Sequence, residues 1–276
     1  MPLVKLTDML PGGRWAIPAL NVENMEMAQG VVEAAEALRA PVILQTTPGT
    51  LKHAPPALFV SMISALARSA RVPVGLHLDH GDSLDLVYDA LEAGYTSVMF
   101  DGSKLSFEEN VTATARAVAM AGGVPVEGEL GAVGGKEDSH SARAELTDPA
   151  QAAEFALRTG AAMLAVAIGT AHGVYAVEPK LDMKRLSAIK AAVSIPLVLH
   201  GTSGISAQQV RSCVMRGVRK VNVATELRAA FTQGVRSSLS ENENAFDPKI
   251  YMGAGRARVR AVAEDWIRVC GAKGKA

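Results

Sequence analysis

Three side chains that can bind a metal ion or move a proton stand close together near residue 80. His77, Asp79 and His80 come at the end of an apolar run that follows Pro73, and a glycine comes next. Side chains alternate along an extended strand, so His77 and Asp79 are expected on one face. His80 is expected where the strand gives way to the turn. This is how a buried parallel strand delivers polar residues to the rim of a barrel.

Two further histidines share the local pattern of His80. His172 and His200 also end or follow an apolar run, and all three are followed directly by glycine. Neutral imidazoles from different strand ends could converge on one metal ion. A single histidine of this kind is better explained as a core or loop residue. The repetition of the pattern at three places favours a metal site.

The elements that must position these residues alternate along the whole chain. Apolar runs that predict strands occur at 15–20, 41–45, 74–78, 97–100, 124–126, 163–168, 196–199 and 220–223. Helical patterns occur between them at 25–38, 58–69, 83–93, 107–121, 149–159, 183–192 and 207–216. Strands that alternate with helices form parallel β/α units. We therefore expect one domain over 1–276, a closed (β/α)8 TIM barrel, with a C-terminal helical extension at about 245–272.

Polar residues follow the ends of the predicted strands. They are Asn21, Thr46, Thr47, Asp79, His80, Asp101, Glu127, Glu129, His172, His200, Asn222 and Thr225. The catalytic face of this fold is the face where the strands end. A structural protein has no reason to gather its polar residues there. The loop 131–146 is long and rich in glycine, which is typical of a functional loop.

Composition excludes several classes of function. The 28 basic and 28 acidic residues give a formal charge of zero, so no general attraction to nucleic acid is expected. The sequence has no signal peptide pattern and no apolar run of about 18 residues, so no membrane span is expected. Cys213 and Cys270 are expected to be free buried thiols of a cytoplasmic protein.

Five motifs in this order resemble the class II, metal-dependent ketose-bisphosphate aldolase family. They are His-x-Asp-His at 77–80, Glu-x-Glu-Leu-Gly at 127–131 with Gly-Gly-x-Glu at 134–137, Ala-Ile-Gly-Thr-Ala-His-Gly at 167–173, Leu-His-Gly-Thr-Ser-Gly at 199–204, and Asn-Val-Ala-Thr-Glu-Leu at 222–227. The resemblance covers nearly the whole chain. Ala224 and the ending near Cys270 are closest to the tagatose-bisphosphate branch.

The resemblance implies a metal centre and two proton-transfer groups. His80, His172 and His200 would ligate one catalytic Zn2+, and a monovalent cation in addition is left open. Glu129 would bind the metal ion in an alternative position, or act as a buried structural carboxylate. Asp79 would handle the proton of the C4 hydroxyl, unless it only orients a histidine. Glu137 would move the proton at C3 of dihydroxyacetone phosphate, and without the motif it would be a solvated loop charge.

The same resemblance assigns the substrate contacts. Phosphate would lie against Gly173, Gly201, Ser203, Asn222 and Thr225, since loops after the seventh and eighth strands commonly bind it. Asn21 and Thr47 would touch the substrate hydroxyls or the enediolate. The arginine that the fructose-specific branch uses for the far phosphate has no match, because Gly253 stands in its place. Arg256, Arg258 and Arg260 are the nearest candidates.

The predicted activity is reversible cleavage of a ketose 1,6-bisphosphate, tagatose or fructose, to dihydroxyacetone phosphate and glyceraldehyde 3-phosphate. Other aldehyde halves stay open, as does a non-catalytic subunit of an aldolase complex. A Schiff-base aldolase is disfavoured, because Lys220, the one strand lysine, is expected at the wrong end of its strand. The family forms homodimers and homotetramers, and some members work with a stabilising second subunit.

Overall fold

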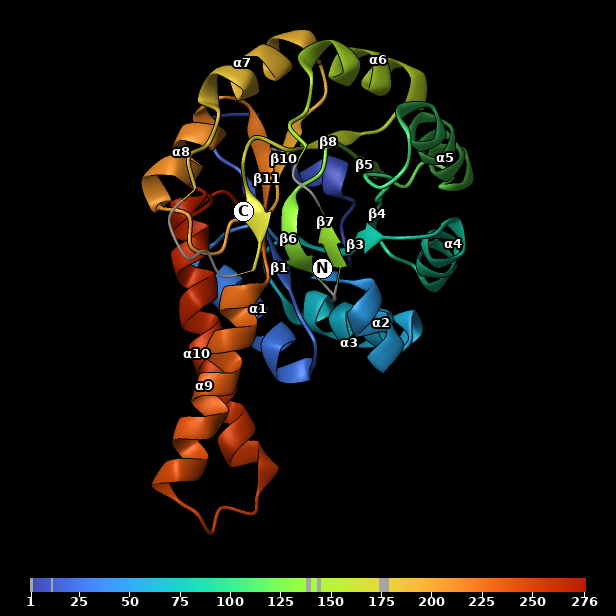
Figure 1. Cartoon of the computed structure of the whole chain (residues 1–276). Helices are drawn as coiled ribbons and strands as arrows, with labels where there is room; N and C mark the ends of the chain where they lie inside the picture. The colour runs from blue at the N-terminus through green and yellow to red at the C-terminus, as the bar shows by residue number, and fades with distance from the viewer. Residues whose placement is uncertain (1, 11, 138–139, 143–144, 174–178) are drawn as a thin grey trace.

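Eight parallel strands close into a barrel, which confirms the predicted single-domain (β/α)8 fold (Figure 1). The computed structural model describes residues 2–10, 12–137, 140–142, 145–173 and 179–276, with the backbone alone for 134–137 and 140–142. The barrel strands are β1 (Ile17–Asn21), β2 (Val42–Thr46), β3 (Val74–Gly81), β4 (Ser97–Phe100), β5 (Val126–Leu130), β8 (Met163–Val166), β10 (Leu197–Leu199) and β11 (Val218–Val223). The closing pair is β1 and β11, which hydrogen-bond in parallel.

Helices cover the outside of the barrel, and most of them begin directly after a residue whose side chain caps them. They are α1 (Met25–Leu38), α3 (Pro56–Ser69), α4 (Leu84–Ala93), α5 (Phe107–Met120), α6 (Pro149–Thr159), α7 (Met183–Ala192) and α8 (Ala207–Met215). Ser106, for example, accepts a hydrogen bond from the Glu109 N–H, and the Glu109 carboxylate reaches back to it. The predicted helices lie within two residues of these bounds. A short helix, α2 (Pro48–His53), was not expected.

Alternation along the strands separates two apolar layers. Outward residues such as Leu76 and Leu78 of β3 pack under the helices in the main core. Inward residues such as Ile17 and Met163 fill the barrel near the start of the strands. A 3-10 helix at Leu6–Met9 closes this end, because Leu6 and Met9 are buried in the same cluster. The inward-facing residues nearer the carboxyl ends of the strands are polar, so the site lies at the end of the barrel opposite the 3-10 helix.

The fifth strand differs from its prediction. It was expected at 124–126 but runs from Val126 to Leu130. Glu127 and Glu129 point into the barrel and interrupt the apolar pattern, which made the strand look shorter than it is.

A small second sheet lies beside the barrel, and two of its three strands lie in the segment expected to be a glycine-rich loop. It has the order β7-β6-β9, where β6 is Gly134–Glu137, β7 is His140–Ala142 and β9 is Ala171–His172. Gly135 of β6 pairs in register with His172 of β9. This pairing joins the backbone of the glycine-rich segment to a predicted metal ligand.

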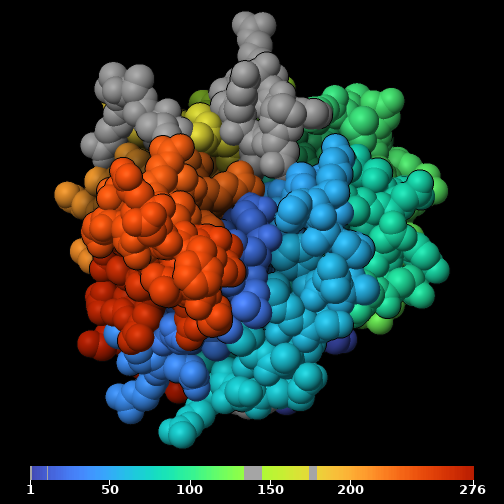
Figure 2. Space-filling view, turned by 90° about the horizontal axis from the view of Figure 1, so that it is seen from below, coloured from blue at the N-terminus to red at the C-terminus, as the bar shows by residue number. Residues whose placement is uncertain are grey.

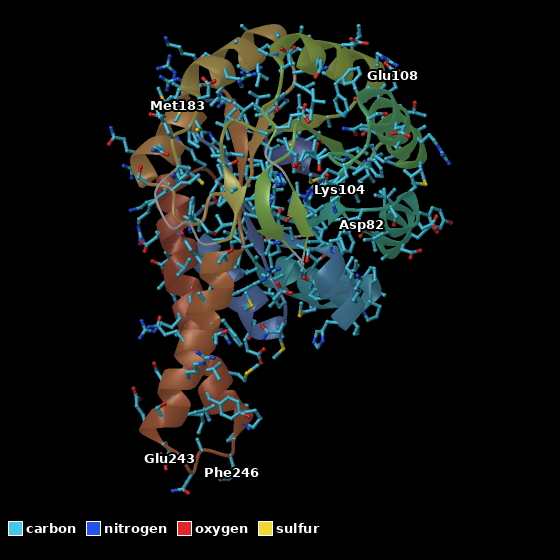
Figure 3. The ribbon with its side chains drawn as sticks, in the orientation of Figure 1. Asp82, Lys104, Glu108, Met183, Glu243 and Phe246 are labelled. Atoms are coloured by element: carbon cyan, nitrogen blue, oxygen red, sulfur yellow. The ribbon has the colours of Figure 1, made fainter. Side chains whose placement is uncertain are left out.

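The C-terminal helices form a hairpin that projects from the barrel (Figures 1 and 3). It consists of α9 (Thr225–Glu241), which was not expected, and α10 (Pro248–Val269), which lies in the range of the predicted extension. Phe246 lies at its tip and is 92% exposed (Figure 3). Gly30 lets α10 approach α1 closely, since a Cβ there would lie 2.8 Å from the Arg256 carbonyl oxygen.

Two further expectations concern the thiols and membrane helices. Cys213 and Cys270 are buried and form no disulfide, as predicted. Among the described residues, none of the helices combines the length and the apolar character needed to cross a bilayer.

Candidate active site

An irregularity near the end of β3 turns two consecutive side chains toward the site. The register of β3 with β4 shifts between Leu78 and Gly81. Within this shift His80 has a left-handed backbone, with φ 51°. Strict alternation would place Asp79 and His80 on opposite faces, and a bulge is the usual way to re-aim a side chain. The backbone strain at His80 is of the kind found at functional sites.

The three predicted metal ligands come together. Ligand nitrogens of His80, His172 and His200 all lie within 4.8 Å of one another. The ring centroids of His80 and His172 are 4.9 Å apart, and those of His80 and His200 are 4.7 Å apart. The three residues come from β3, β9 and the end of β10, which are far apart in the sequence. The barrel therefore assembles the set.

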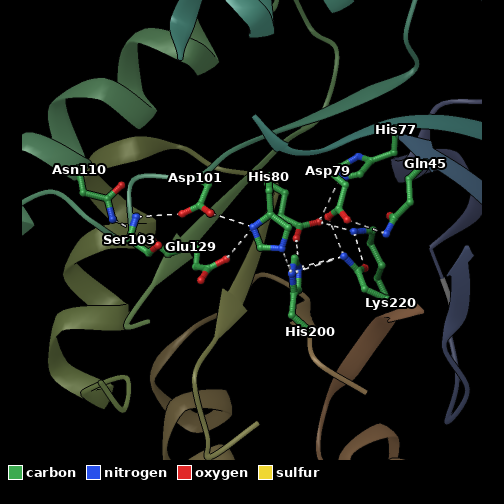
Figure 4. A network of polar contacts seen from close by, with 12 residues as sticks. Gln45, His77, Asp79, His80, Asp101, Ser103, Asn110, Glu129, His200 and Lys220 are labelled. Carbon is green, nitrogen blue, oxygen red and sulfur yellow. Dashed lines mark hydrogen bonds and ion pairs between the residues drawn. The ribbon is translucent and has the colours of Figure 1, made fainter. Parts of the chain in front are cut away.

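A half-buried carboxylate, Asp101, and a fully buried one, Glu127, fix the orientation of two of these rings, and Figure 4 shows Asp101 beside His80. His80 Nδ1 lies 2.8 Å from Asp101 Oδ2, and His200 Nε2 lies 2.8 Å from Glu127 Oε1. Burial pushes the pKa of Asp101 upward, but the hydrogen bond and charge of His80 hold it well below its usual value. An ionised carboxylate only accepts, so each of these ring nitrogens donates.

When both rings are neutral, their remaining nitrogens face each other as acceptors. His80 Nε2 lies 2.9 Å from His200 Nδ1. Burial also lowers the pKa of His200, which favours the neutral ring. Neutral imidazoles whose outer N–H groups bond carboxylates are the usual ligands of catalytic zinc. The donor set therefore fits a metal ion.

Glu129 offers a second way to hold a cation beside His80. A carboxylate oxygen of Glu129 lies within 4.8 Å of ligand atoms of His80 and Asp101. Glu129 Oε2 is buried and has no hydrogen-bond partner in the described part of the chain. Burial, and then the nearby Asp101, raise the pKa of Glu129 well above its usual value. A carboxyl group in this state gains from a cation nearby, which suits an alternative ligand.

Asp79 is buried in the same site and accepts three amide hydrogen bonds. Asn21 Nδ2 and Gln45 Nε2 each lie 3.1 Å from Oδ2, and Asn222 Nδ2 lies 2.8 Å from Oδ1. These amides come from β1, β2 and β11, so the carboxylate is held from three strands. Asp101, not Asp79, is the carboxylate that bonds the His80 ring.

A buried ion pair supports the site from below. Lys220 Nζ lies 2.9 Å from Glu127 Oε2 and 2.8 Å from Asn222 Oδ1. Burial pushes the pKa of Glu127 upward, but the charge of Lys220 and the contact with His200 hold it well below its usual value. Lys220 lies inside β11, which begins at Val218, and not at the start of its strand as expected, and its ammonium group contacts Glu127 and Asn222. A Schiff-base lysine must reach the substrate carbonyl, whereas this ammonium group donates hydrogen bonds to Glu127 and Asn222.

A pocket at this end of the barrel holds most of the predicted substrate contacts. Its lining includes predicted residues Asn21, Asp79, His172, Gly173, Gly201, Ser203, Asn222 and Thr225. Thr47 is not among them, because it is buried as the N-cap of α2. The side chain of Glu137 lies outside the described part of the chain, although its backbone ends β6.

The sequence analysis did not assign roles to several residues of the site. Gln45 and Glu127 stand two residues before Thr47 and Glu129, so strand alternation could have indicated them. Lys220 stands two residues before Asn222, so the same alternation could have indicated it as well. Arg228 also lines the pocket, but it lies on α9, a helix that was not predicted from the sequence.

The arginines proposed for the far phosphate lie along α10. Arg256 contacts Glu33 and Gln29 of α1, and Arg260 Nε lies 3.2 Å from Glu264 Oε1 of its own helix. Among the described residues, the pocket next to Asp79 is lined by none of Arg256, Arg258 and Arg260.

A (β/α)8 barrel with converging histidines and a buried acid at the carboxyl end of its strands defines a metal-dependent barrel enzyme. The chain belongs to the class II fructose-bisphosphate aldolase family, whose model matches residues 3–275. This confirms the resemblance in the motifs, and the protein is a metal-dependent aldolase, a lyase.

Solved structures agree with this assignment. The chain is similar to the YdjI aldolase from Escherichia coli K12, with 38% identity and a TM-score of 0.85 over 98% of this chain and 96% of that one. It is also similar to the fructose-bisphosphate aldolase from Campylobacter jejuni, with 25% identity and a TM-score of 0.82 over 95% of this chain and 92% of that one.

Proposed function

We propose that the protein is a zinc-dependent aldolase that reversibly cleaves a ketose 1,6-bisphosphate, tagatose or fructose, to dihydroxyacetone phosphate and glyceraldehyde 3-phosphate. The convergence of His80, His172 and His200 beside the buried Asp79 carries the proposal. The relatives are named as aldolases, which supports the reaction type. The Ala224 form of the last motif favours the tagatose branch.

The three histidines would hold Zn2+, with Glu129 as an alternative ligand. A bound Zn2+ supplies a Lewis acid that stabilises negative charge on the oxygen at C2 of the ketose. Asp101 and Glu127 keep the outer ring nitrogens of His80 and His200 protonated, so the inner nitrogens face the centre.

Two carboxylates divide the proton transfers. Asp79 accepts the proton of the C4 hydroxyl as the C3–C4 bond breaks, and the amides of Asn21, Gln45 and Asn222 hold it in place. Glu137 moves the proton at C3 of dihydroxyacetone phosphate.

Backbone N–H groups bind the phosphate of the dihydroxyacetone half. Gly173, Gly201, Ser203, Asn222 and Thr225 line the pocket next to the histidines. Gly201 has φ 64° and leaves no room for a side chain, since a Cβ would lie 2.6 Å from the Ala171 carbonyl oxygen. Because Gly201 has no side chain, the loop after β10 can pack against β9 and His172.

Metal removal and a substrate panel test the proposal. Treatment with EDTA should abolish release of dihydroxyacetone phosphate from tagatose and fructose 1,6-bisphosphates, and Zn2+ should restore it. The alternative, a non-catalytic subunit, predicts no cleavage by the purified zinc-loaded protein. Full activity of the metal-free protein would contradict the metal assignment.

Proton exchange tests the role of Glu137 separately. In D2O the enzyme should exchange the C3 proton of dihydroxyacetone phosphate, which proton NMR follows directly. Glu137→Ala should slow this exchange by about 100-fold, the usual scale for a general base. Exchange at the wild-type rate would show that Glu137 is only a loop charge.

The proposal also includes a homodimer or homotetramer, with a stabilising second subunit left open. Light scattering of the purified chain measures the assembly directly.

A further inference from the structure

The buried lysine of β11 contacts both halves of the site. Lys220 Nζ lies 2.9 Å from Glu127 Oε2 and 2.8 Å from Asn222 Oδ1. Glu127 leads to the metal centre, because its other oxygen bonds the His200 ring. Asn222 leads to the proposed proton-transfer group, because its Nδ2 lies 2.8 Å from Asp79 Oδ1. The first contact is an ion pair, whereas the second reaches a neutral amide that in turn contacts Asp79.

Closure of the barrel places this lysine among groups from distant segments. β11 pairs with β1, and Figure 2 shows the orange surface of the C-terminal hairpin beside the blue surface of the first β/α units. Lys220 is fully buried, with 0% exposure, and Figure 4 shows it in one network with Asp79 and His200. A buried polar network specifies one arrangement of its members when their contacts are made. The contacts of Lys220 therefore help to select the arrangement of its neighbours.

The ammonium group determines which way the Asn222 amide faces. An ammonium nitrogen only donates hydrogen bonds, so the amide atom next to it must be the oxygen. The amide nitrogen then faces Asp79 Oδ1 and donates to it. The opposite orientation would place the amide nitrogen against the ammonium group and the amide oxygen against the carboxylate. Two donors and two acceptors would then face each other, so Lys220 excludes this orientation.

Asn21 shows the same arrangement with a neutral donor. Gln45 Nε2 lies 2.7 Å from Asn21 Oδ1, and Asn21 Nδ2 lies 3.1 Å from Asp79 Oδ2. On both the β1 and the β11 side, the amide that donates to Asp79 has its oxygen occupied by a second donor. Asp79 is held from both sides only when both amides face this way. Proton transfer depends steeply on the position of the acid/base group, so the orientation of these amides bears on catalysis.

We propose that Lys220 is a positioning residue for Asp79, because it orients the Asn222 amide that holds this carboxylate. In this role it acts through Asn222 and not on the substrate itself. The inference rests on the proposed function, since it explains how the group that takes the C4 hydroxyl proton is held. Loss of the lysine should impair cleavage of the C3–C4 bond more than proton exchange at C3, because only cleavage uses Asp79.

The ratio of two rates measures this role. Single-turnover cleavage of the ketose bisphosphate uses Asp79, whereas exchange of the C3 proton of dihydroxyacetone phosphate in D2O does not. Both reactions need the metal ion, so an effect that passes through Glu127 and His200 lowers both rates and leaves their ratio unchanged. At saturating Zn2+, Lys220→Met should lower the ratio of cleavage to exchange by about 10-fold, the scale of one hydrogen bond to a charged group. Lys184→Met, at an exposed lysine of α7, should match the wild type in both rates.

A second pair of variants separates the lysine from its charge partner. Glu127→Gln keeps Lys220 next to Asn222 and should keep the ratio within about threefold of the wild type. Glu127→Gln/Lys220→Met should lower the ratio by about 10-fold relative to Glu127→Gln. The double variant leaves no unpaired buried charge, so this comparison decides if Lys220→Met alone does not fold.

Removal of the amide tests the route from the lysine to Asp79. A double-mutant cycle isolates an effect that passes through one partner. In an Asn222→Ala background, Lys220→Met should change the ratio by less than about twofold, because the amide that the lysine orients is absent.

Three results would overturn the inference. Equal falls in cleavage and exchange would assign Lys220 to the metal centre alone. An unchanged ratio would show that Asp79 is held without the lysine. The same fall of the ratio in the Asn222→Ala background would show that the effect does not pass through the amide. A zinc-loaded wild-type enzyme that neither cleaves a ketose bisphosphate nor exchanges the C3 proton would instead refute the proposed function.

Discussion

At the scale of single residues, the contacts of Asp79 differ from those of the carboxylates that hold the histidine rings. The carboxylate that bonds His80 is that of Asp101, whereas Asp79 is held by amides inside the pocket. These contacts favour a proton-transfer role for Asp79 over the role of orienting a histidine. Asp79 and His80 are adjacent in the chain, and the bulge at His80 allows both side chains to face the site.

Asp79→Ala should retain zinc and lower C–C cleavage by about 10²- to 10⁴-fold, the range of general acid–base catalysis. Exchange of the C3 proton should persist, because no C4 hydroxyl takes part in it. Zinc content and the rates of cleavage and exchange are the measurements. Asp82→Ala, at an exposed residue just beyond the same strand, is the matched control. Loss of zinc together with recovery of activity in excess zinc would return Asp79 to an orienting role.

Glu127 joins the metal centre to a buried lysine, so its two functions can be separated. Glu127→Gln should weaken zinc binding by about 10- to 100-fold, because the His200 ring loses its carboxylate. It should also destabilise the fold by about 3–5 kcal/mol, since Lys220 keeps a buried charge without its partner.

The double variant Glu127→Gln/Lys220→Met tests this division. It should recover much of the stability but none of the zinc affinity. Competition with a chromophoric chelator measures the affinity, and urea unfolding measures the stability. Equal recovery of both quantities would mean that zinc binding depends only on the stability of the fold.

At the scale of elements, the loop after β10 is tied to the C-terminal hairpin. Glu226 of α9 accepts a hydrogen bond of 3.0 Å from the Gly204 N–H and one of 2.7 Å from Trp266 Nε1 of α10. Gly201 and Ser203, which are proposed to bind phosphate, belong to the same loop. The hairpin therefore contributes to the position of that loop.

Glu226→Ala should raise KM for the ketose bisphosphate by about 5- to 10-fold with little change in kcat, as expected for one lost hydrogen bond that positions a binding loop. Trp266→Phe removes the indole N–H and part of the buried ring but leaves the contact between Glu226 and Gly204, so it should have a smaller effect on KM. Steady-state kinetics of the zinc-loaded variants distinguish these outcomes. A fall in kcat with KM unchanged would argue against a binding role for the loop.

The elements also show where prediction from sequence succeeds and where it stops. Period-two and helical patterns are local, so seven helices and the barrel strands could be placed within a few residues. Inward polar residues broke the apolar pattern of β5, and its bounds were therefore wrong. The left-handed backbone at His80 depends on the pairing of β3 with β4, which no local pattern contains.

Contacts between segments that are far apart in the chain could not be predicted from the sequence either. Glu23 and Arg228 are 205 residues apart, and they meet because β1 closes the barrel against β11. Lys220 reaches Glu127 across the interior of the barrel. The motifs identify the histidines and Asp79 as candidate site residues. Which carboxylate bonds which ring becomes clear only in the closed barrel.

At the scale of the whole molecule, the interior of the barrel combines an apolar lower layer with a polar upper layer. The lower layer and the N-terminal 3-10 helix supply hydrophobic stability near Ile17 and Met163. The upper layer buries ionisable groups, which links stability to pH. His77 is the clearest case, because it is fully buried at 0% exposure and is not one of the proposed ligands.

Burial, and then the charge of Lys220, lower the pKa of His77 well below its usual 6.5. Above pH 6.5 the ring is neutral in both the folded and unfolded states, so it does not affect the pH dependence. As pH falls below 6.5, the unfolded chain binds a proton that the folded chain excludes. The free energy of unfolding should then fall by about 1.4 kcal/mol per pH unit for this group, until its folded pKa is reached. Glu129 has a raised pKa and opposes this trend, so a comparison of variants isolates His77.

His77→Gln in zinc-free protein should therefore show a shallower loss of stability between pH 6.5 and 5 than the wild type, by about 1.4 kcal/mol per pH unit. Urea unfolding at a series of pH values measures both slopes. His53→Gln, at an exposed histidine, controls for the change in composition. Parallel slopes for His77→Gln and the wild type would mean that His77 binds its proton equally in the folded and unfolded states. The polar layer would then tolerate a second buried cation beside Lys220.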